Sequence, residues 1–229
     1  MDYSTWSPVY HAILGDFGFP EAADETARDE LAARTDPFDL DRLGFLAGAT
    51  VAIAGAAPSL AGELDIAREA DAVVAASTAA DVLREAGIAV DLMVTDIDKN
   101  PETIRTLTRE GTPVAVHAHG DNIPAIRAEV PTFVREHVLP TTQAAPVAPV
   151  ENFGGFTDGD RAAFLADHFG AGALTFLGWD FDDPAVDPMK AKKLDWAERL
   201  LYWLERRRGE QFTILDGRRE AIDTSDIPR

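Results

Sequence analysis

The sequence contains no cysteine and no long apolar run. The absence of cysteine excludes disulfide bonds, thiolate metal sites and a cysteine nucleophile, so any bound metal must be held by oxygen or imidazole groups. No window approaches ~18 consecutive apolar residues, and no basic run precedes an apolar stretch near Asp2, so neither a membrane span nor a secretion signal is predicted. We therefore expect a cytoplasmic protein with no membrane partner.

Basic residues, and lysine above all, are also scarce. The chain has 21 basic against 40 acidic residues and a net charge of −19, which argues against nucleic acid or an anionic membrane surface as a partner, because both are polyanions. Only four of the basic residues are lysines, at positions 99, 190, 192 and 193. This skew favours adaptation to high salt, where an acidic surface is screened. An ordinary acidic protein from a GC-rich genome is the alternative, and unfolding at low and high KCl separates the two.

The pattern of apolar segments predicts an α/β fold. From residue 49 onward, short apolar runs alternate with segments of helical period, which is typical of three layers in which helices flank a mostly parallel sheet. The expected strands are Thr50–Ala54, Ala72–Ala76, Leu92–Thr95, Pro113–His117, Thr132–Leu139, Leu174–Leu177 and a late Gln211–Leu215 with no assigned place in the sheet. The expected helices are Ala61–Glu69, Ala79–Ala86, Pro101–Glu110, Asp158–Phe169 and Met189–Arg208. The proline-rich stretch Pro140–Pro149 is predicted to be a long loop.

Residues 1–45 are predicted to form an N-terminal helical extension, and residues 46–229 a single α/β domain. Ser7-Pro8 and Phe19-Pro20 punctuate the extension, and its acidic segment Glu21–Arg34 is typical of a solvated helix. We expect the extension to serve in packing or in oligomerisation, for example in a homodimer.

Two carboxylates follow the third expected strand. In parallel α/β sheets, ligands bind outside the carboxyl ends of the strands, so the residues directly after each apolar run matter most. The sequence there is Thr95-Asp96-Ile97-Asp98, in which both carboxylates could reach one hard cation if the strand ends in a turn. The alternative is that these residues cap the helix predicted to begin at Pro101.

Two histidines follow the next strand. His117 and His119 face the same way if the strand continues through them, and Gly120 turns the chain toward Asp121. Because two of the five histidines fall within three positions, a functional role is favoured over a chance pair of core histidines.

The same segment supports a rival interpretation. H-x-H-x-D opens the metal motif of the metallo-β-lactamase-like hydrolases, in which imidazole and carboxylate groups hold zinc. That motif continues with a histidine where this chain has Asn122, and it needs further histidines downstream. Only His137 and His168 remain there, the first in an apolar run and the second inside a predicted helix.

Two glycine-containing segments precede expected helices and suit phosphate. The segment Asn152–Arg161 contains paired glycines and two aspartates, and its backbone N–H groups and helix N-terminus could face a phosphate while the aspartates reach a cation. A helix cap alone would not require the glycines. Earlier in the chain, Gly55–Leu60 follows the first strand at a position suited to phosphate or nucleotide. It is not a dinucleotide fingerprint, and the chain has no P-loop motif.

Taken in order, these motifs resemble the archaeal 6-hydroxymethyl-7,8-dihydropterin pyrophosphokinase family. The matching segments are G-A-A-P-S-L, V-D-L-M-V-T-D-I-D, H-A-H-G-D-N, T-T-Q, N-F-G-G-F-T-D-G-D-R-A, G-W-D-F and K-A-K-K-L, and they cover roughly residues 45–205. The family is similar in fold to the catalytic domain of thiamine pyrophosphokinase. The resemblance implies transfer of pyrophosphate from ATP to the hydroxymethyl oxygen of the pterin, with release of AMP and with Mg²⁺ as the cofactor.

The resemblance also implies roles for individual residues. The expected Mg²⁺ ligands are Asp96, Asp98 and Asp158, with Asp121 and Asp160 as second candidates. The residues expected to contact nucleotide or phosphate are Gly55, Ser59, Asn122, Gln143, Gly154, Gly155, Thr157, Arg161 and Lys193. His117 or His119 would orient the phosphates or help to remove the hydroxymethyl proton. Asp180 would contact the pterin or cap the following segment.

One departure from the family pattern concerns the acceptor. After the second strand an acidic segment is expected, and this chain has Ser77 there instead. Three alternatives therefore stay open: a thiamine-type pyrophosphokinase with another acceptor, a zinc hydrolase using H-A-H-G-D, and a nucleotide-binding module without catalysis.

Overall fold

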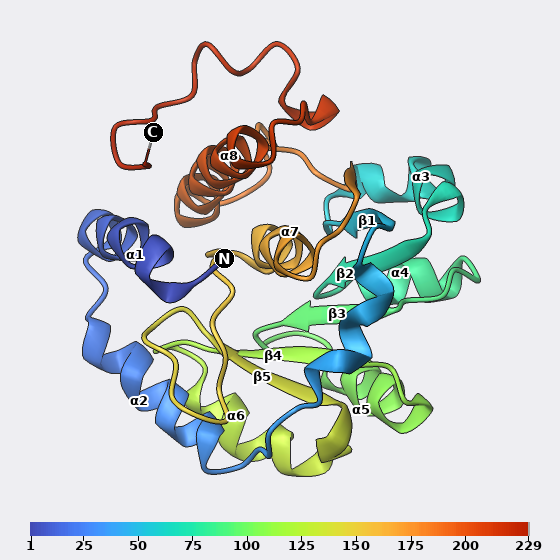
Figure 1. The fold of residues 1–229 in the computed structure, drawn as a ribbon, viewed down its shortest axis with the longest axis vertical. Coiled ribbons are helices and arrows are strands. Elements are labelled where there is room, and N and C mark those ends of the chain that lie inside the picture. Colours follow the sequence, from blue (N-terminus) through green and yellow to red (C-terminus); the bar gives the residue numbers. More distant parts are fainter. Residues whose placement is uncertain (229) are drawn as a thin grey trace.

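The computed structural model describes residues 1–228, with a six-stranded sheet at its centre (Figure 1). The strands are β1 (Thr50–Ala54), β2 (Ala72–Ala76), β3 (Leu92–Thr95), β4 (Val114–Ala118), β5 (Val138–Thr142) and β6 (Ala173–Leu177). They lie in the order β5-β4-β3-β2-β1-β6, and every neighbouring pair is parallel. The α/β prediction is confirmed, and the sheet is entirely parallel.

The strands are apolar because both faces of the sheet are covered. In β1, Val51 and Ile53 belong to one buried hydrophobic cluster, and Ala52 and Ala54 belong to the other. Successive side chains of a strand point to opposite faces, so each strand supplies both clusters. All five residues of β2 are buried, as expected for a parallel sheet between two layers of helices.

Two helical layers enclose the sheet (Figure 1). The face that carries Val51 is covered by α1 (Tyr3–Phe17), α7 (Asp158–His168) and α8 (Pro188–Arg208). The face that carries Ala52 is covered by α2 (Glu21–Ala32), α3 (Leu64–Glu69), α4 (Ala79–Glu85), α5 (Pro101–Glu110) and α6 (Ile123–Glu129). No helix within residues 1–228 is both long enough and apolar enough to cross a membrane.

The strand order places a ligand-binding edge. The chain steps from β1 to β5 in one direction and then returns past β1 to β6. Right-handed crossovers account for the opposite placement of α3 to α6 and of α7. Ligands in such sheets bind outside the carboxyl ends of the strands, near the point where the direction reverses, which here is between β1 and β6.

The N-terminal segment is less exposed than its composition indicates. Pro8 lies inside α1 and does not end it. Burial of the apolar face of α1 outweighs the roughly 3 kcal/mol that an internal proline costs a helix; this face consists of Trp6, Val9, Tyr10, Ile13 and Leu14. The expectation of a solvated helix at Glu21–Arg34 is wrong for one side of α2, where Ala27 and Leu31 pack against the strands and α6.

Two strand predictions are wrong. In place of Thr132–Leu139, the chain forms two short 3₁₀ turns and then β5, so the residues Pro140–Thr142 of the predicted loop are a strand. Pro140 is tolerated because β5 is an edge strand, which leaves one side of its backbone free of ladder bonds. The late apolar run Gln211–Leu215 ends in a 3₁₀ turn rather than a strand, and Phe212 packs on Phe176 of β6.

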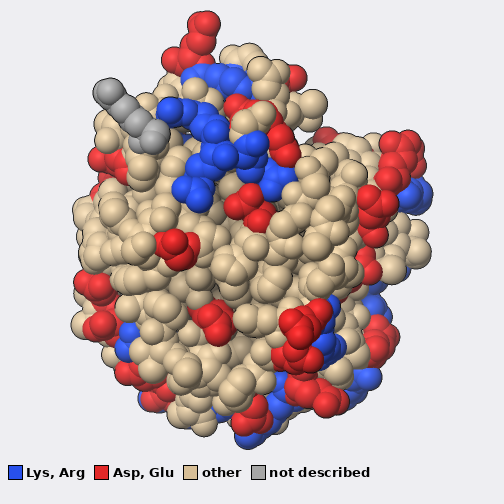
Figure 2. All heavy atoms as spheres, viewed as in Figure 1, with Lys and Arg blue, Asp and Glu red and all other residues tan. Residues whose placement is uncertain are grey.

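Charged side chains are distributed unevenly over the surface. Figure 2 shows basic groups gathered over α8 and the C-terminal segment, with acidic groups spread over the rest of this face. Several of these arginines are held in ion pairs: Arg218 contacts Asp182 and Glu198, and Arg219 contacts Glu205. The basic cluster therefore fixes the C-terminal segment to the domain and leaves few free cations.

Candidate active site

A strained turn brings two carboxylates together at the end of β3. Ile97 lies between Asp96 and Asp98, has a φ of 59°, and is buried. A positive φ is unfavourable for a β-branched residue, and strain of this kind is concentrated at functional sites. The backbone N–H of Ile97 donates to Thr95 Oγ1 at 3.0 Å and closes the turn.

The two carboxyl groups share one site. Burial raises the pKa of Asp96, but hydrogen bonds from His119 and Asp98 and the charge of Arg161 outweigh it and lower that pKa. Burial and the adjacent Asp96 raise the pKa of Asp98 to about 6. Asp96 Oδ1 is buried without a hydrogen-bond partner among residues 1–228. This arrangement leaves an oxygen free to bind a cation.

Asn122 ties the β3 and β4 loops together. Its amide Nδ2 donates to the carbonyl of His117 at 2.7 Å and to that of Asp96 at 2.9 Å, and its Oδ1 accepts from the N–H of His119 at 3.0 Å. Asn122 is buried and does not line either of the two larger cavities. Its amide group therefore orders the loops that carry the site.

The two histidines of the β4 segment face different spaces. His119 lines the larger charged cavity, and its Nε2 lies 3.4 Å from Asp96 Oδ2. His117 is buried beside an internal cavity of about 10 Å³, with Nδ1 3.1 Å from Thr141 Oγ1. Burial and the charge of Arg161 lower the pKa of His117 well below its ordinary value. His117 is thus a neutral group beneath the site.

The start of α7 explains the glycine-rich segment. Thr157 is the N-cap, and Asp160 completes a capping box by accepting from the backbone N–H groups of Phe156 and Thr157 and from the Thr157 hydroxyl. Gly155 has a φ of 93°, and a Cβ there would lie 2.6 Å from the Cα of Arg161. The carboxylate of Asp160 is therefore occupied by the helix start.

Asp158 and Arg161 project from the first turn of α7 into the site. Arg161 donates to Asp158 Oδ1 at 3.1 Å and to Gln143 Oε1 at 3.0 Å. Burial and the negative charge of Asp96 raise the pKa of Asp158 to about 7, although Arg161 opposes the shift. Three carboxyl groups at one edge repel each other, so a bound cation would stabilise the cluster.

Asp24 on α2 links the N-terminal segment to the site. Its Oδ1 accepts from the N–H of Gly120 at 2.8 Å, and its Oδ2 accepts from Tyr10 at 2.8 Å and from Gln143 Nε2 at 2.7 Å. A Cβ at Gly120 would lie 2.6 Å from Ala23 Cβ, so the glycine permits this close approach of the β4 loop to α2. Asp24 was not predicted from the sequence.

These groups surround a first cavity of about 180 Å³ at the carboxyl edge of the sheet. Its charged and polar lining comes from the loops after β3, β4 and β5 and from α2, α7 and α8: Asp24, Asp96, Asp98, Lys99, His119, Asp121, Gln143, Thr157, Asp158, Arg161, Lys190 and Lys193. Phe19 and Phe156 add aromatic surface.

A second cavity of about 240 Å³ adjoins the first, at the reversal between β1 and β6. Small residues after β1 form one wall, and a Cβ at Gly55 would lie 2.5 Å from the carbonyl of Gly178. Trp179 forms another wall, with its indole N–H donating to Ile53 O at 3.1 Å. Ser77 has a φ of 50°, and its hydroxyl is buried without a hydrogen-bond partner in the described chain.

Four residues line both cavities: Lys99, Thr157, Asp158 and Lys190. Much of Lys190 is accessible, but desolvation at the cavity wall, together with the charge of Lys99, lowers its pKa. The two lysines are therefore close enough to influence each other at the junction.

The structure brings most of the predicted site residues together. Those that line the first cavity are Asp96, Asp98, His119, Asp121, Gln143, Thr157, Asp158, Arg161 and Lys193, and Gly55 and Asp180 line the second. Those that line neither are Ser59, His117, Asn122, Gly154, Gly155 and Asp160. The residues that sequence reasoning missed are Phe19, Asp24, Lys99, Phe156, Trp179 and Lys190. Of these, only the lysines carried a signal, in their scarcity.

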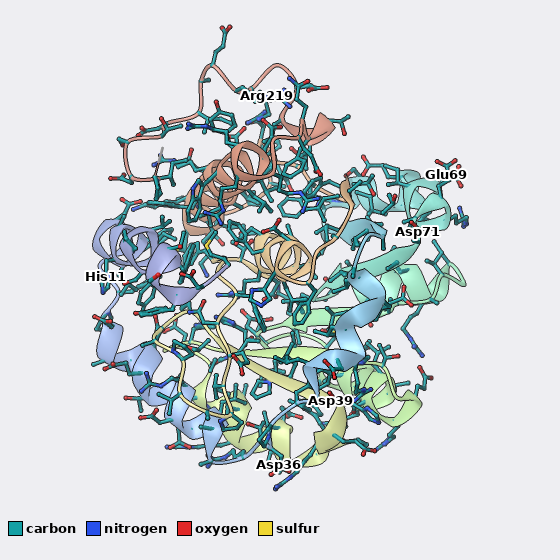
Figure 3. The ribbon with its side chains drawn as sticks, in the orientation of Figure 1. His11, Asp36, Asp39, Glu69, Asp71 and Arg219 are labelled. Atoms are coloured by element: carbon teal, nitrogen blue, oxygen red, sulfur yellow. The ribbon has the colours of Figure 1, made fainter. Side chains whose placement is uncertain are left out.

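The geometry does not support a zinc site. His117 and His119 face different cavities, and the remaining histidines lie elsewhere: His11 on the outer side of α1 beside Glu21 (Figure 3), His137 before β5, and His168 at the end of α7. Within residues 1–228, no three His, Cys, Asp or Glu side chains converge in an arrangement that holds a metal by themselves.

The parallel sheet and the acidic cleft at its carboxyl edge define an α/β protein built for a small, charged ligand. The sequence model of the family described as 6-hydroxymethylpterin diphosphokinase MptE-like matches residues 33–185. The chain belongs to this family.

Relatives from three archaea resemble the chain over nearly its whole length. The protein of Methanothermobacter thermautotrophicus is 38% identical, with 90% of this chain and 96% of the relative covered. Those of Methanocaldococcus jannaschii and Pyrococcus furiosus are 33% and 34% identical, each over 90% of this chain, and cover 96% and 95% of the relatives. All three are named 6-hydroxymethyl-7,8-dihydropterin pyrophosphokinase.

Proposed function

We propose that this chain transfers the pyrophosphoryl group of ATP to the hydroxymethyl oxygen of 6-hydroxymethyl-7,8-dihydropterin, giving the pterin diphosphate and AMP. The names of the three relatives support the activity and the acceptor. The structural observation that carries the proposal is the cluster of Asp96, Asp98 and Asp158 beside Arg161 and Lys193 in one cavity. Carboxylates for a cation and fixed positive groups for phosphate are the two requirements of phosphoryl transfer.

The proposed reaction exchanges one bond to phosphorus for another. The acceptor oxygen bonds to the β-phosphorus, and the bond from that phosphorus to the oxygen bridging to the α-phosphate breaks. AMP leaves with that oxygen and the electron pair. We assign removal of the hydroxyl proton to His119, because it lines the first cavity and Asp96 beside it stabilises the protonated ring.

The donor set fits Mg²⁺. Asp96 offers an unpartnered oxygen, and the raised pKa values of Asp98 and Asp158 reflect mutual repulsion that a cation relieves. Mg²⁺ is usually held by one or two carboxylates together with substrate phosphates, so a complete protein cage is not required. Bound Mg²⁺ would neutralise phosphate charge. We propose Asp96, Asp98 and Asp158 as its ligands with Asp121 as an alternative, and we omit Asp160, which caps α7.

The two cavities suit the two substrates. An in-line displacement requires the acceptor and the leaving AMP on opposite sides of the β-phosphorus. We place the pterin in the first cavity, beside His119 and the aromatic rings of Phe19 and Phe156, and the nucleoside in the second, at the strand-order reversal. The N-terminal segment then forms part of the acceptor wall through Phe19 and Asp24.

The test is incubation of the protein with ATP, Mg²⁺ and 6-hydroxymethyl-7,8-dihydropterin at low and high KCl, followed by separation of the nucleotides. AMP should form in step with the pterin diphosphate. Formation of ADP, or no turnover under any condition, would contradict the proposal. A parallel reaction with thiamine tests the other acceptor, and AMP formation with thiamine alone would transfer the assignment to a thiamine-type enzyme.

A further inference from the structure

The junction of the two cavities carries two cations that the fold itself does not use. Lys99 lies between β3 and α5, and Lys190 lies in the first turn of α8. Among residues 1–228, neither ammonium group has a carboxylate within ion-pair distance or a hydrogen-bond acceptor, whereas Lys192 pairs with Asp16 at 2.8 Å.

The position of Lys190 is unfavourable without a ligand. It is the third residue of α8, where the partial positive charge of the helix N-terminus disfavours a cation. Lys99 adds a second positive charge nearby, and the two come from segments about ninety residues apart. Both unfavourable terms are removed by an anion bound between the lysines.

Lysine is also unusual in this protein. The chain has four lysines against 17 arginines, and three of the four line the two cavities. Surface ion pairs elsewhere are made almost entirely by arginine, for example Arg84 with Glu110 and Arg127 with Glu30. A compact ammonium group can follow phosphate oxygens as a bond is broken, whereas a guanidinium imposes a planar fork.

We propose that Lys99 and Lys190 bind the triphosphate of ATP where the two cavities meet, with the β- and γ-phosphates toward Asp96 and Asp158 and the nucleoside toward Trp179. This deepens the proposed function and rests on it for the identity of the nucleotide. The two ammonium groups then lie beside the bond that breaks, where they stabilise the charge that develops on the departing α-phosphate oxygen.

Kinetics of single variants test the assignment. Lys99→Ala and Lys190→Ala should each lower kcat/KM for ATP about tenfold or more, as expected for loss of a charge-assisted bond to phosphate, and leave KM for the pterin within about twofold. Lys192→Ala, the matched control on the same helix, should change neither. Lys190→Arg should recover part of the loss. Equal increases in both KM values, or a change in kcat/KM for ATP below about threefold, would overturn the proposal.

Binding of inorganic tripolyphosphate gives a readout that does not require turnover. In calorimetry with Mg²⁺ present, the parent and Lys192→Ala should bind tripolyphosphate, and the Lys99→Ala/Lys190→Ala double variant should bind at least about tenfold more weakly. Equal binding by the double variant would overturn the proposal. Because both lysines are exposed, thermal unfolding of the variants should match that of the parent and verify that they are folded.

The two experiments separate the inference from the function on which it rests. If the parent binds tripolyphosphate through both lysines and forms no AMP with the pterin, the pyrophosphokinase assignment fails and the anion site stands. If AMP forms and neither lysine affects the kinetics or the binding, the anion site fails and the activity stands.

Discussion

The two cavities share a wall but differ in what lines the rest of each. In the first, Asp96, Asp98 and Asp158 face Arg161 and Lys193, and the pKa values of two of the carboxyl groups are raised to about 6 and about 7. The second is lined mainly by small neutral residues and by the fixed ring of Trp179. The first cavity therefore has unbalanced charge that ligands must neutralise, and the second offers shape and a few polar atoms.

The cavities also differ in how they are held. The first depends on side-chain hydrogen bonds that join α2, β4, β5 and α7 through Asp24, Gln143 and Arg161. The second depends on close backbone approach at Gly55 and Gly178. Substitutions around the first cavity should thus alter the chemistry, and those around the second should mainly alter the binding of one substrate.

Asp96→Asn should have the largest effect. Loss of one charged oxygen from the carboxylate cluster should lower kcat by about 100- to 1000-fold, the range for removal of one group that stabilises a phosphoryl-transfer transition state. AMP formation measures it. The matched substitution in the second cavity, Asp180→Asn, should reduce kcat less than tenfold, by the loss of no more than one hydrogen bond of about 1 kcal/mol. Retention of more than a tenth of the parent kcat by Asp96→Asn would remove the distinction between the cavities.

Asp24→Asn should have the next largest effect, although Asp24 is not proposed as a ligand. Its two oxygens accept from three donors, and an amide at this position turns its NH₂ group toward at least one of them. We expect a loss of about 1–3 kcal/mol in the free energy of unfolding, because buried donors are left unpaired. Denaturant unfolding measures this loss.

The same variant should lower kcat by about tenfold, since Gln143 and Arg161 lose their fixed positions. Tyr10→Phe removes only one of the three donors and should change both quantities less. Equal effects of the two substitutions would show that Asp24 supports the helix pair alone and does not order the first cavity.

Ser77→Ala should separate binding from stability in the second cavity. The Ser77 hydroxyl has no hydrogen-bond partner within residues 1–228, so its removal should change the free energy of unfolding by less than about 0.5 kcal/mol. If the hydroxyl bonds to bound nucleotide, KM for ATP should rise about two- to tenfold with kcat unchanged. A rise in KM for the pterin instead would exchange the substrates assigned to the two cavities.

Sequence reasoning located the first cavity better than its supports. Asp96, Asp98, His119 and Asp158 follow apolar strands or begin a helix, and the strand-end rule groups such residues without a structure. Asp24 escaped prediction because Gly120 and Gln143 are 96 and 119 residues away in the chain. No local pattern records a contact of that separation.

The same limit explains the errors in secondary structure and in residue roles. Thr132–Leu139 has the composition of a strand, but tertiary packing moves the edge strand to Val138–Thr142. Asp160 matched a metal-binding pattern, and its carboxylate instead closes the helix start. Type of residue and position at a strand end predicted where the site is, and hydrogen bonding decides which oxygens are free.

The histidine pair gives the smallest and most specific test of the comparison. Burial and the charge of Arg161 hold the pKa of His117 well below its ordinary 6.5, so the folded protein keeps this ring neutral. In the unfolded chain the ring binds a proton as the pH falls below about 6.5. The unfolded state therefore takes up more protons than the folded state in this range, and the His117 contribution to stability is lost as the pH falls.

His117→Gln should be less stable than the parent at pH 7.5, because the glutamine packs less well, but the gap should narrow by up to about 2 kcal/mol at pH 5, at 1.36 kcal/mol for each pH unit below 6.5. Urea unfolding of both proteins between pH 5 and pH 8 measures the gap. A constant gap would mean that His117 titrates in the folded protein as it does in solvent. The ring would then have access to the first cavity, and both histidines of the β4 segment would be available to the substrates.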